Sequence, residues 1–103
     1  MSIVLVTYPP QVKKGGEEAA IVATFPKGAG ESVTVKSLEK LQRQFRGKLE
    51  IAHLSDGSPK ITRSVMVASV QDAREKALQF GKLLHSDFPY EPIIQPCAEH
   101  ATA

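Results

Sequence analysis

The 103-residue sequence predicts an α+β fold, a two-layer sandwich of helices on a β-sheet. Two observations carry this prediction: β-branched apolar runs end at prolines, and two other stretches repeat apolar residues at helical spacing. Hydrophobic residues make up 42% of the chain and charged residues 23%, which is ordinary for a globular protein. The length fits one domain, which we place at residues 1–96, followed by a flexible tail at residues 97–103.

Two strands are predicted near the amino terminus. Ile3–Tyr8 is β-branched and ends at two prolines, and Ala19–Phe25 is apolar and ends at a third. The polar stretch between them, Gln11–Glu18, contains two adjacent glycines and predicts a turn. The two strands are therefore expected to form a hairpin with a long mobile loop.

A strand and a helix are predicted next. Ser32–Lys36 alternates between apolar and polar residues, which favours a short strand. Ser37–Arg46 is predicted to be a helix capped by its first residue, with a narrow apolar stripe of Leu38, Leu41 and Phe45. The remaining side chains of this helix are polar, so it is expected to lie on a surface.

The clearest hairpin signal joins the strands Lys48–Leu54 and Ile61–Ala68 through the turn sequence Ser55–Pro59. A loop of these five residues pairs Ile51 with Arg63. We favour this register because it gathers most apolar side chains on one face, although it leaves Arg63 among apolar neighbours.

The second helix is predicted over Ser69–Ser86, with Ser69 as its N-cap. Its apolar stripe comprises Val70, Ala73, Ala77, Phe80, Gly81 and Leu84. A glycine inside a helix costs about 1 kcal/mol relative to alanine, so Gly81 predicts a close approach to a strand. Ile93–Gln95 is expected to add a short edge strand.

From Ser32 onward the elements follow the ferredoxin-like βαββαβ order, and the amino-terminal hairpin would extend or cap that sheet. The alternative is a mostly antiparallel sheet with two helices on one face. Either sheet has an exposed edge, and a small chain gains buried surface by joining sheets, so a homodimer is a further hypothesis.

The net charge is only +2, but basic residues cluster around the first helix with only Glu39 opposing them. The predicted polyanion-binding residues are Lys36, Lys40, Arg43, Arg46 and Lys48, joined by Lys60 and Arg63 from the hairpin. Such a cluster attracts nucleic acid or an acidic protein surface. The competing interpretation is a solvated helix face. The strands Ser32–Lys36 and Ile61–Ala68 contain no aromatic residue, which disfavours base stacking and leaves a duplex backbone or an acidic protein as the partner.

Patterns for catalysis or cofactor binding are weak. The C-x-E-H pattern at Cys97–His100 has no further metal ligands at a recognisable spacing. His53 lies near Asp56 and Ser58, but no nucleophile motif surrounds them. The glycines of Lys27–Glu31 match no phosphate or dinucleotide motif. We therefore expect a non-enzymatic binding protein without a cofactor or a metal.

No apolar run has the length that a bilayer requires, and the amino terminus does not resemble a secretory signal. With a single cysteine, the chain is expected to be cytoplasmic and not to bind a membrane. Two other functions stay open. One is a regulatory domain that binds a small molecule. The other is an adaptor or inhibitor that pairs through an exposed strand, such as Ile93–Gln95 or Ile3–Tyr8.

Overall fold

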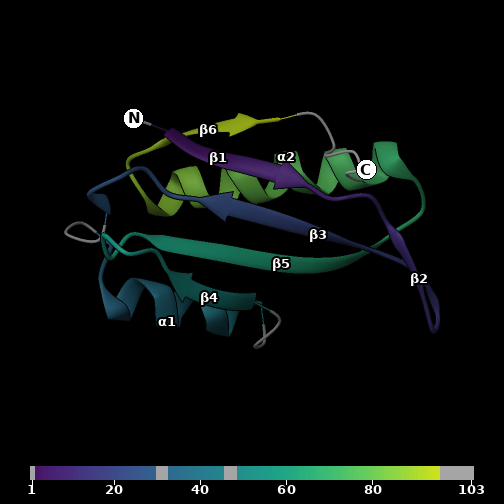
Figure 1. The fold of residues 1–103 in the computed structure, drawn as a ribbon, viewed down its shortest axis with the longest axis horizontal. Coiled ribbons are helices and arrows are strands. Elements are labelled where there is room, and N and C mark those ends of the chain that lie inside the picture. The colour runs from purple at the N-terminus through teal and green to yellow at the C-terminus, as the bar shows by residue number, and fades with distance from the viewer. Residues whose placement is uncertain (1, 30–32, 46–48, 96–103) are drawn as a thin grey trace.

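The computed structural model describes residues 2–29, 33–45 and 49–95, and it shows an α+β fold of two helices packed on a mixed sheet of six strands (Figure 1). Both helices lie behind the sheet in this view, so the facing side of the sheet carries no helix. The elements are β1 (Ser2–Thr7), β2 (Gln11–Lys13), β3 (Gly16–Thr24), α1 (Val35–Gln44), β4 (Leu49–His53), β5 (Pro59–Val67), α2 (Val70–Asp87) and β6 (Glu91–Ile94).

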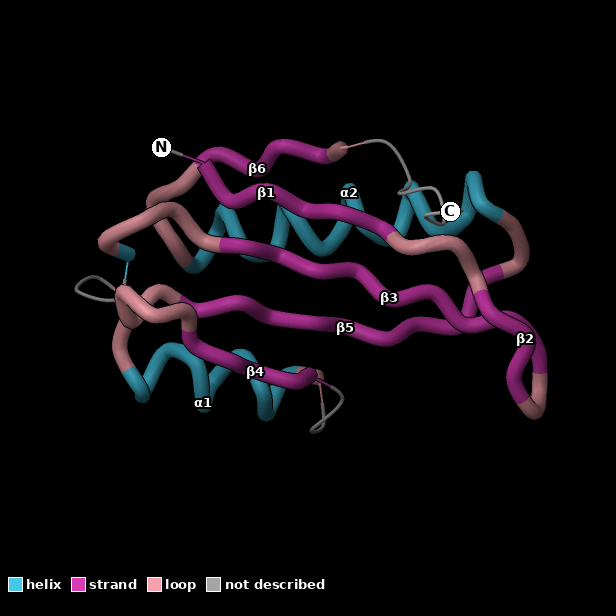
Figure 2. The backbone as a smooth tube through the Cα atoms, viewed as in Figure 1, coloured by secondary structure: helices cyan, strands magenta, loops and turns pink. Residues whose placement is uncertain are grey.

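The strand order is β4-β5-β3-β1-β6, and β2 pairs with β3 (Figure 2). Only β1 and β6 run parallel; the other pairs are antiparallel. The predicted pairing of the first two long strands is confirmed, with Val6 opposite Val22. However, this hairpin lies in the middle of the sheet rather than extending or capping it, because β3 also pairs with β5 from Glu17 to Thr24. The predicted turn at residues 11–18 contains β2 and the start of β3.

The predicted ferredoxin-like order from Ser32 onward is wrong because residues 33–36 do not form a strand. Thr34 is instead the N-cap of α1. Its hydroxyl accepts a hydrogen bond from the backbone N–H of Ser37 at 3.1 Å, and the Ser37 hydroxyl accepts one from the Thr34 N–H at 3.1 Å. This reciprocal capping box starts the helix at Val35 rather than Ser37. The alternative, a mostly antiparallel sheet with two helices on one face, describes the observed fold.

The β4–β5 hairpin is confirmed, but its register differs from the prediction by two residues. Ile51 lies opposite Ile61, and Arg63 lies opposite Leu49. The cause is the turn, in which the Gly57 N–H donates to the Leu54 carbonyl at 2.9 Å and Gly57 adopts a φ of 86°. Because a shift of two residues preserves the side on which each side chain lies, Arg63 still faces the helices among apolar neighbours, as predicted.

Helix α2 is the element that the sequence predicts most accurately. The Ser69 hydroxyl caps it by accepting from the Asp72 N–H at 3.1 Å. The stripe from Ala73 to Leu84 is buried as predicted, whereas Val70 is 54% exposed. The predicted close approach at Gly81 is confirmed, since a Cβ there would lie 3.0 Å from the Cβ of Pro92 on β6.

One apolar core fills the space between the sheet and both helices. Phe45 at the end of α1 meets Phe80 of α2 edge to face, with ring centroids 5.5 Å apart. Phe25 makes a similar contact with Phe88 at 5.2 Å. The helices are therefore anchored on the same side of the sheet, and the opposite side has no covering layer among the described residues.

Candidate polyanion-binding surface

Three of the predicted basic residues share one exposed side of α1. Lys36, Lys40 and Arg43 follow each other at steps of four and three residues, which places them on one side of a helix. All three are exposed, because Leu38 and Leu41 turn the opposite side of α1 into the core. We call Lys36, Lys40 and Arg43 the basic face of α1.

Among the described residues, no carboxylate forms an ion pair with the basic face, and Glu39 on the same helix is exposed. Arg43 lies in the last turn of α1, where the helix dipole favours a cation. Lys36 lies in the first turn, where the dipole disfavours a cation and no acidic residue is present. The helix itself therefore gives no reason for a lysine at this position.

The other predicted basic residues do not join this face. Arg46 and Lys48 lie outside the described residues. Lys60 is exposed, but it projects from the side of the sheet that carries no helix, between Ala52 and Thr24 in the neighbouring strands. It therefore lies on the opposite side of the molecule from α1.

Arg63 is used inside the fold. Its guanidinium carbon lies 4.7 Å from the centre of the Phe45 ring and 5.6 Å from that of Phe80. Burial lowers the pKa of this guanidinium from its ordinary value. Stacking on aromatic faces is a structural role for a partly desolvated arginine, so we remove Arg63 from the polyanion-binding set.

A cavity of about 590 Å³ opens beside Arg63 at the start of β4. Phe45 and Val65 line its apolar part, and Glu18 and Glu50 also contribute to its walls. Two carboxylates beside one guanidinium do not favour an anionic ligand in this cavity.

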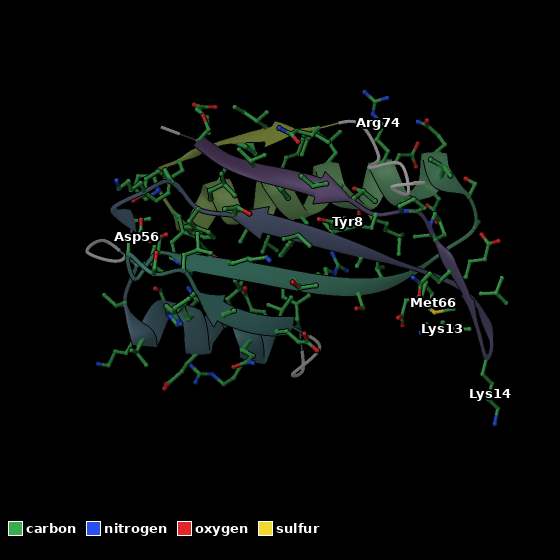
Figure 3. The ribbon with its side chains drawn as sticks, in the orientation of Figure 1. Tyr8, Lys13, Lys14, Asp56, Met66 and Arg74 are labelled. Atoms are coloured by element: carbon green, nitrogen blue, oxygen red, sulfur yellow. The ribbon has the colours of Figure 1, made fainter. Side chains whose placement is uncertain are left out.

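The side of the sheet without helices, which we call the open face, was not predicted. Its central strands present apolar side chains where an exposed sheet normally carries polar ones. The open face carries Val4 and Val6 from β1, Tyr8 directly after β1, Ala20 and Val22 from β3, Met66 from β5 and Ile93 from β6. Tyr8 is 47% exposed and Met66 46% exposed; both are labelled in Figure 3.

A signal for the open face was present in the sequence. In IVLVTY and AAIVATF, nearly every residue is apolar or β-branched, not every second one. Such continuous runs are typical of strands that are covered on both sides. A sheet with one solvated side predicts alternation instead, so these two runs could have indicated a second apolar surface.

Within the described residues, no hydrogen bond joins His53 to Asp56 or Ser58. The Ser58 hydroxyl and the Ser58 N–H both donate a hydrogen bond to the Asp56 carboxylate, so this carboxylate stabilises the turn. The two hydrogen bonds lower the pKa of Asp56. His85 lies in the last turn of α2, and its Nδ1 is 2.8 Å from the carbonyl oxygen of Tyr90. No group of three potential metal ligands occurs within the described ranges, and Cys97–His100 lies outside them.

Neither α1 nor α2 has the length and hydropathy that a membrane-crossing helix needs. Comparisons with protein-family models, with curated proteins and with solved structures found no match to this chain.

Proposed function

We propose that this chain is a non-enzymatic binding protein that engages a polyanion through the basic face of α1. The observation that carries the proposal is that Lys36, Lys40 and Arg43 are exposed together on one side of the helix without a described carboxylate partner. Three cations at neighbouring positions can contact successive phosphates of a duplex or a row of acidic side chains.

The position of Lys36 supports a role in binding rather than in helix stability. A cation in the first turn opposes the helix dipole, and a negatively charged partner relieves that repulsion. Capping of α1 relies on Thr34 and Ser37, whose hydroxyls take part in neutral hydrogen bonds. The charge of Lys36 is therefore available to a partner at little cost to the fold.

The proposal concerns a charged backbone or an acidic surface, not unpaired bases. Base recognition in single strands depends on aromatic side chains on which bases can stack. On the open face, β1 and β3 present five apolar or β-branched side chains and no aromatic one: Val4, Val6, Ala20, Val22 and Thr24. One aromatic residue, Tyr8, follows directly after β1. Acidic side chains, Glu18 and Glu91, also border that face.

The test is a fluorescence anisotropy titration of labelled duplex DNA, single-stranded RNA and polyglutamate at three salt concentrations. The variant Lys40→Glu/Arg43→Glu reverses two charges of the basic face. Its matched control is Arg74→Glu/Lys82→Glu, which reverses two exposed charges on α2. Each lost phosphate contact reduces the log–log salt slope by about 0.9 for a duplex.

We expect the wild-type protein to bind with a slope of about −3, corresponding to three phosphates, and the α1 variant to lose roughly two-thirds of it. The α2 control should keep the wild-type slope. Binding to polyglutamate but not to nucleic acid would identify an acidic protein as the partner. Absence of binding to every probe at low salt, or equal losses in both variants, would refute the role of the basic face.

The two other hypotheses stay predictions. A small-molecule regulatory domain would use a cavity such as the one beside Arg63. An adaptor that pairs through an edge would use β6, which is an edge strand as predicted, although it spans Glu91–Ile94. Ile3–Tyr8 does not suit that role, because β1 has partners on both sides.

A further inference from the structure

We infer that the open face is the interface of a homodimer in which the sheets of two copies pack face to face. The proposal is independent of polyanion binding, because α1 and the open face lie on opposite sides of the molecule (Figure 1). It commits to a second copy of this chain as the occupant and to the apolar centre of β1, β3 and β6 as the contact.

The sequence of the central strands supports a second covered side. Ile3 and Leu5 are fully buried under the helices, yet Val4 between them and Val6 after Leu5 are also apolar. The same holds in β3, where Ile21 is fully buried and its neighbour Val22 lies on the open face. Strands buried on one side usually carry polar residues on the other.

The side chains of the open face form continuous rows across the sheet. Val22 lies directly opposite Val6 on the neighbouring strand. In the next row, Val4 lies between Thr24 and Ile93, which is 46% exposed. Directly opposed β-branched side chains form a compact apolar surface, and an exposed surface of this kind marks an interaction site.

The placement of charge favours a second copy over a nucleic acid. The charged side chains on this side of the sheet lie on outer strands or near strand ends, away from the central valines: Lys13, Glu18, Glu50, Lys60 and Glu91. An uncharged apolar centre offers a phosphate backbone no positive charge to bind. In a two-fold dimer, residues near the axis meet their own copies, and the uncharged valines at the centre do so without repulsion.

The size of the face also fits a dimer. The molecule measures 37 × 30 Å in the view of Figure 1, which looks down its shortest axis onto the open face. Within this outline, the five strands of the path β4-β5-β3-β1-β6 contain 33 residues, and at about 3.3 Å per residue and about 4.8 Å between strands they cover on the order of 500 Å². Two copies joined through this face would therefore bury about 1,000 Å² in total, which reaches the size of a specific interface. Two sheets packed at an angle of about 30° bury such faces against each other, as in β-sandwiches.

The experiment measures the oligomeric state of the full chain by sedimentation equilibrium and light scattering at micromolar concentrations. The test variant is Ile93→Glu, and its matched control is Leu78→Glu on α2. These two aliphatic side chains are 46% and 45% exposed, so both substitutions should leave the fold intact, which circular dichroism verifies. Only Ile93 lies on the open face.

We expect the wild-type protein to have twice the monomer mass of 11.2 kDa. Ile93→Glu should weaken self-association by on the order of 100-fold or more, because two unpaired carboxylates would become buried at the interface. Leu78→Glu should remain a dimer. A monomeric wild-type protein, a dimeric Ile93→Glu variant, or equal dissociation of both folded variants would overturn the proposal.

Discussion

Replacing Gly81 by alanine tests how tightly α2 packs against the edge of the sheet. An alanine Cβ at this position would lie 3.0 Å from the Cβ of Pro92 and 3.2 Å from the Cδ1 of Ile94. Both distances are shorter than ordinary contacts between carbon atoms. The side chain of Ile94 can rotate away, but the Cβ of Pro92 is fixed by its ring and by the backbone of β6.

Two effects of opposite sign decide the outcome. Alanine favours the helix over glycine by about 1 kcal/mol. Inserting a methyl group into a packed contact costs about 1–3 kcal/mol, and the rigid contact with Pro92 places this site in the upper part of the range. We therefore expect Gly81→Ala to lower the free energy of unfolding by about 1 kcal/mol, which lowers the Tm of a domain of this size by about 4–8 °C.

The assay is chemical and thermal unfolding, combined with hydrogen exchange. Displacement of β6 should weaken the hydrogen bond from the Gln95 N–H to the Leu5 carbonyl, which is 3.0 Å long, so this amide should exchange faster. Gln79→Ala, at an exposed position of the same helix, controls for helix propensity. A Gly81→Ala variant that is as stable as the wild type, with unchanged exchange in β6, would refute the reasoning.

Three further predictions concern individual side-chain contacts. Thr7 is 3% exposed and its hydroxyl has no partner within the described residues, so Thr7→Val should raise the free energy of unfolding by about 1 kcal/mol; a lower urea midpoint would contradict this. Hydrogen bonds from the Ser58 hydroxyl and N–H lower the pKa of Asp56 from its ordinary value of 3.8. The ionised Asp56 carboxylate therefore stabilises the fold fully at a pH above 3.8, and this stabilisation is lost as the pH falls through the lowered pKa of the folded state. Asp56→Asn should therefore flatten the acid limb of stability measured between about pH 5 and about pH 2, and an unchanged limb would count against the turn contact. A double-mutant cycle of Arg63→Ala and Phe45→Leu should give a coupling of about 0.5–2 kcal/mol in urea unfolding, whereas zero coupling would show that the stacking contributes nothing.

Much of the local structure could be predicted because the signals were long. Helix α2 repeats its apolar residues over 18 positions, and both β1 and β3 are apolar runs with clear ends. The strand predicted for the segment before α1 was wrong, because an alternation of only two valines is too short a pattern to indicate a strand. Thr34 and Ser37 carried the stronger signal, a capping box in which serine takes the place of glutamate.

The order of the strands could not be predicted from local patterns. Pairing of β3 with β5 joins residues such as Ala23 and Ile61 that are far apart in the chain, and it depends on how the whole apolar surface is buried. The same pairing moves the amino-terminal hairpin to the centre of the sheet. Topology of this kind is set by packing rather than by any single segment.

Of the predicted site residues, Lys36, Lys40 and Arg43 are exposed on one side of α1, and their role in binding stays a prediction. The separation of Lys60 from Arg63 could have been predicted, because residues three apart in a strand lie on opposite sides of the sheet. The stacking of Arg63 on Phe45 and Phe80 depends on the meeting of two helices and had no local signal.

The position of both helices on one side of the sheet has a consequence for valency. If two copies join through their open faces, their α1 helices lie on the two outer sides of the pair, with both sheets between them. The dimer then cannot hold one short polyanion with both α1 helices, so avidity on a single duplex is absent. Such a dimer joins two polyanions instead. When a short duplex is titrated into the protein, light scattering should therefore be highest near a ratio of one dimer to two duplexes, and it should fall when either the protein or the duplex is in excess.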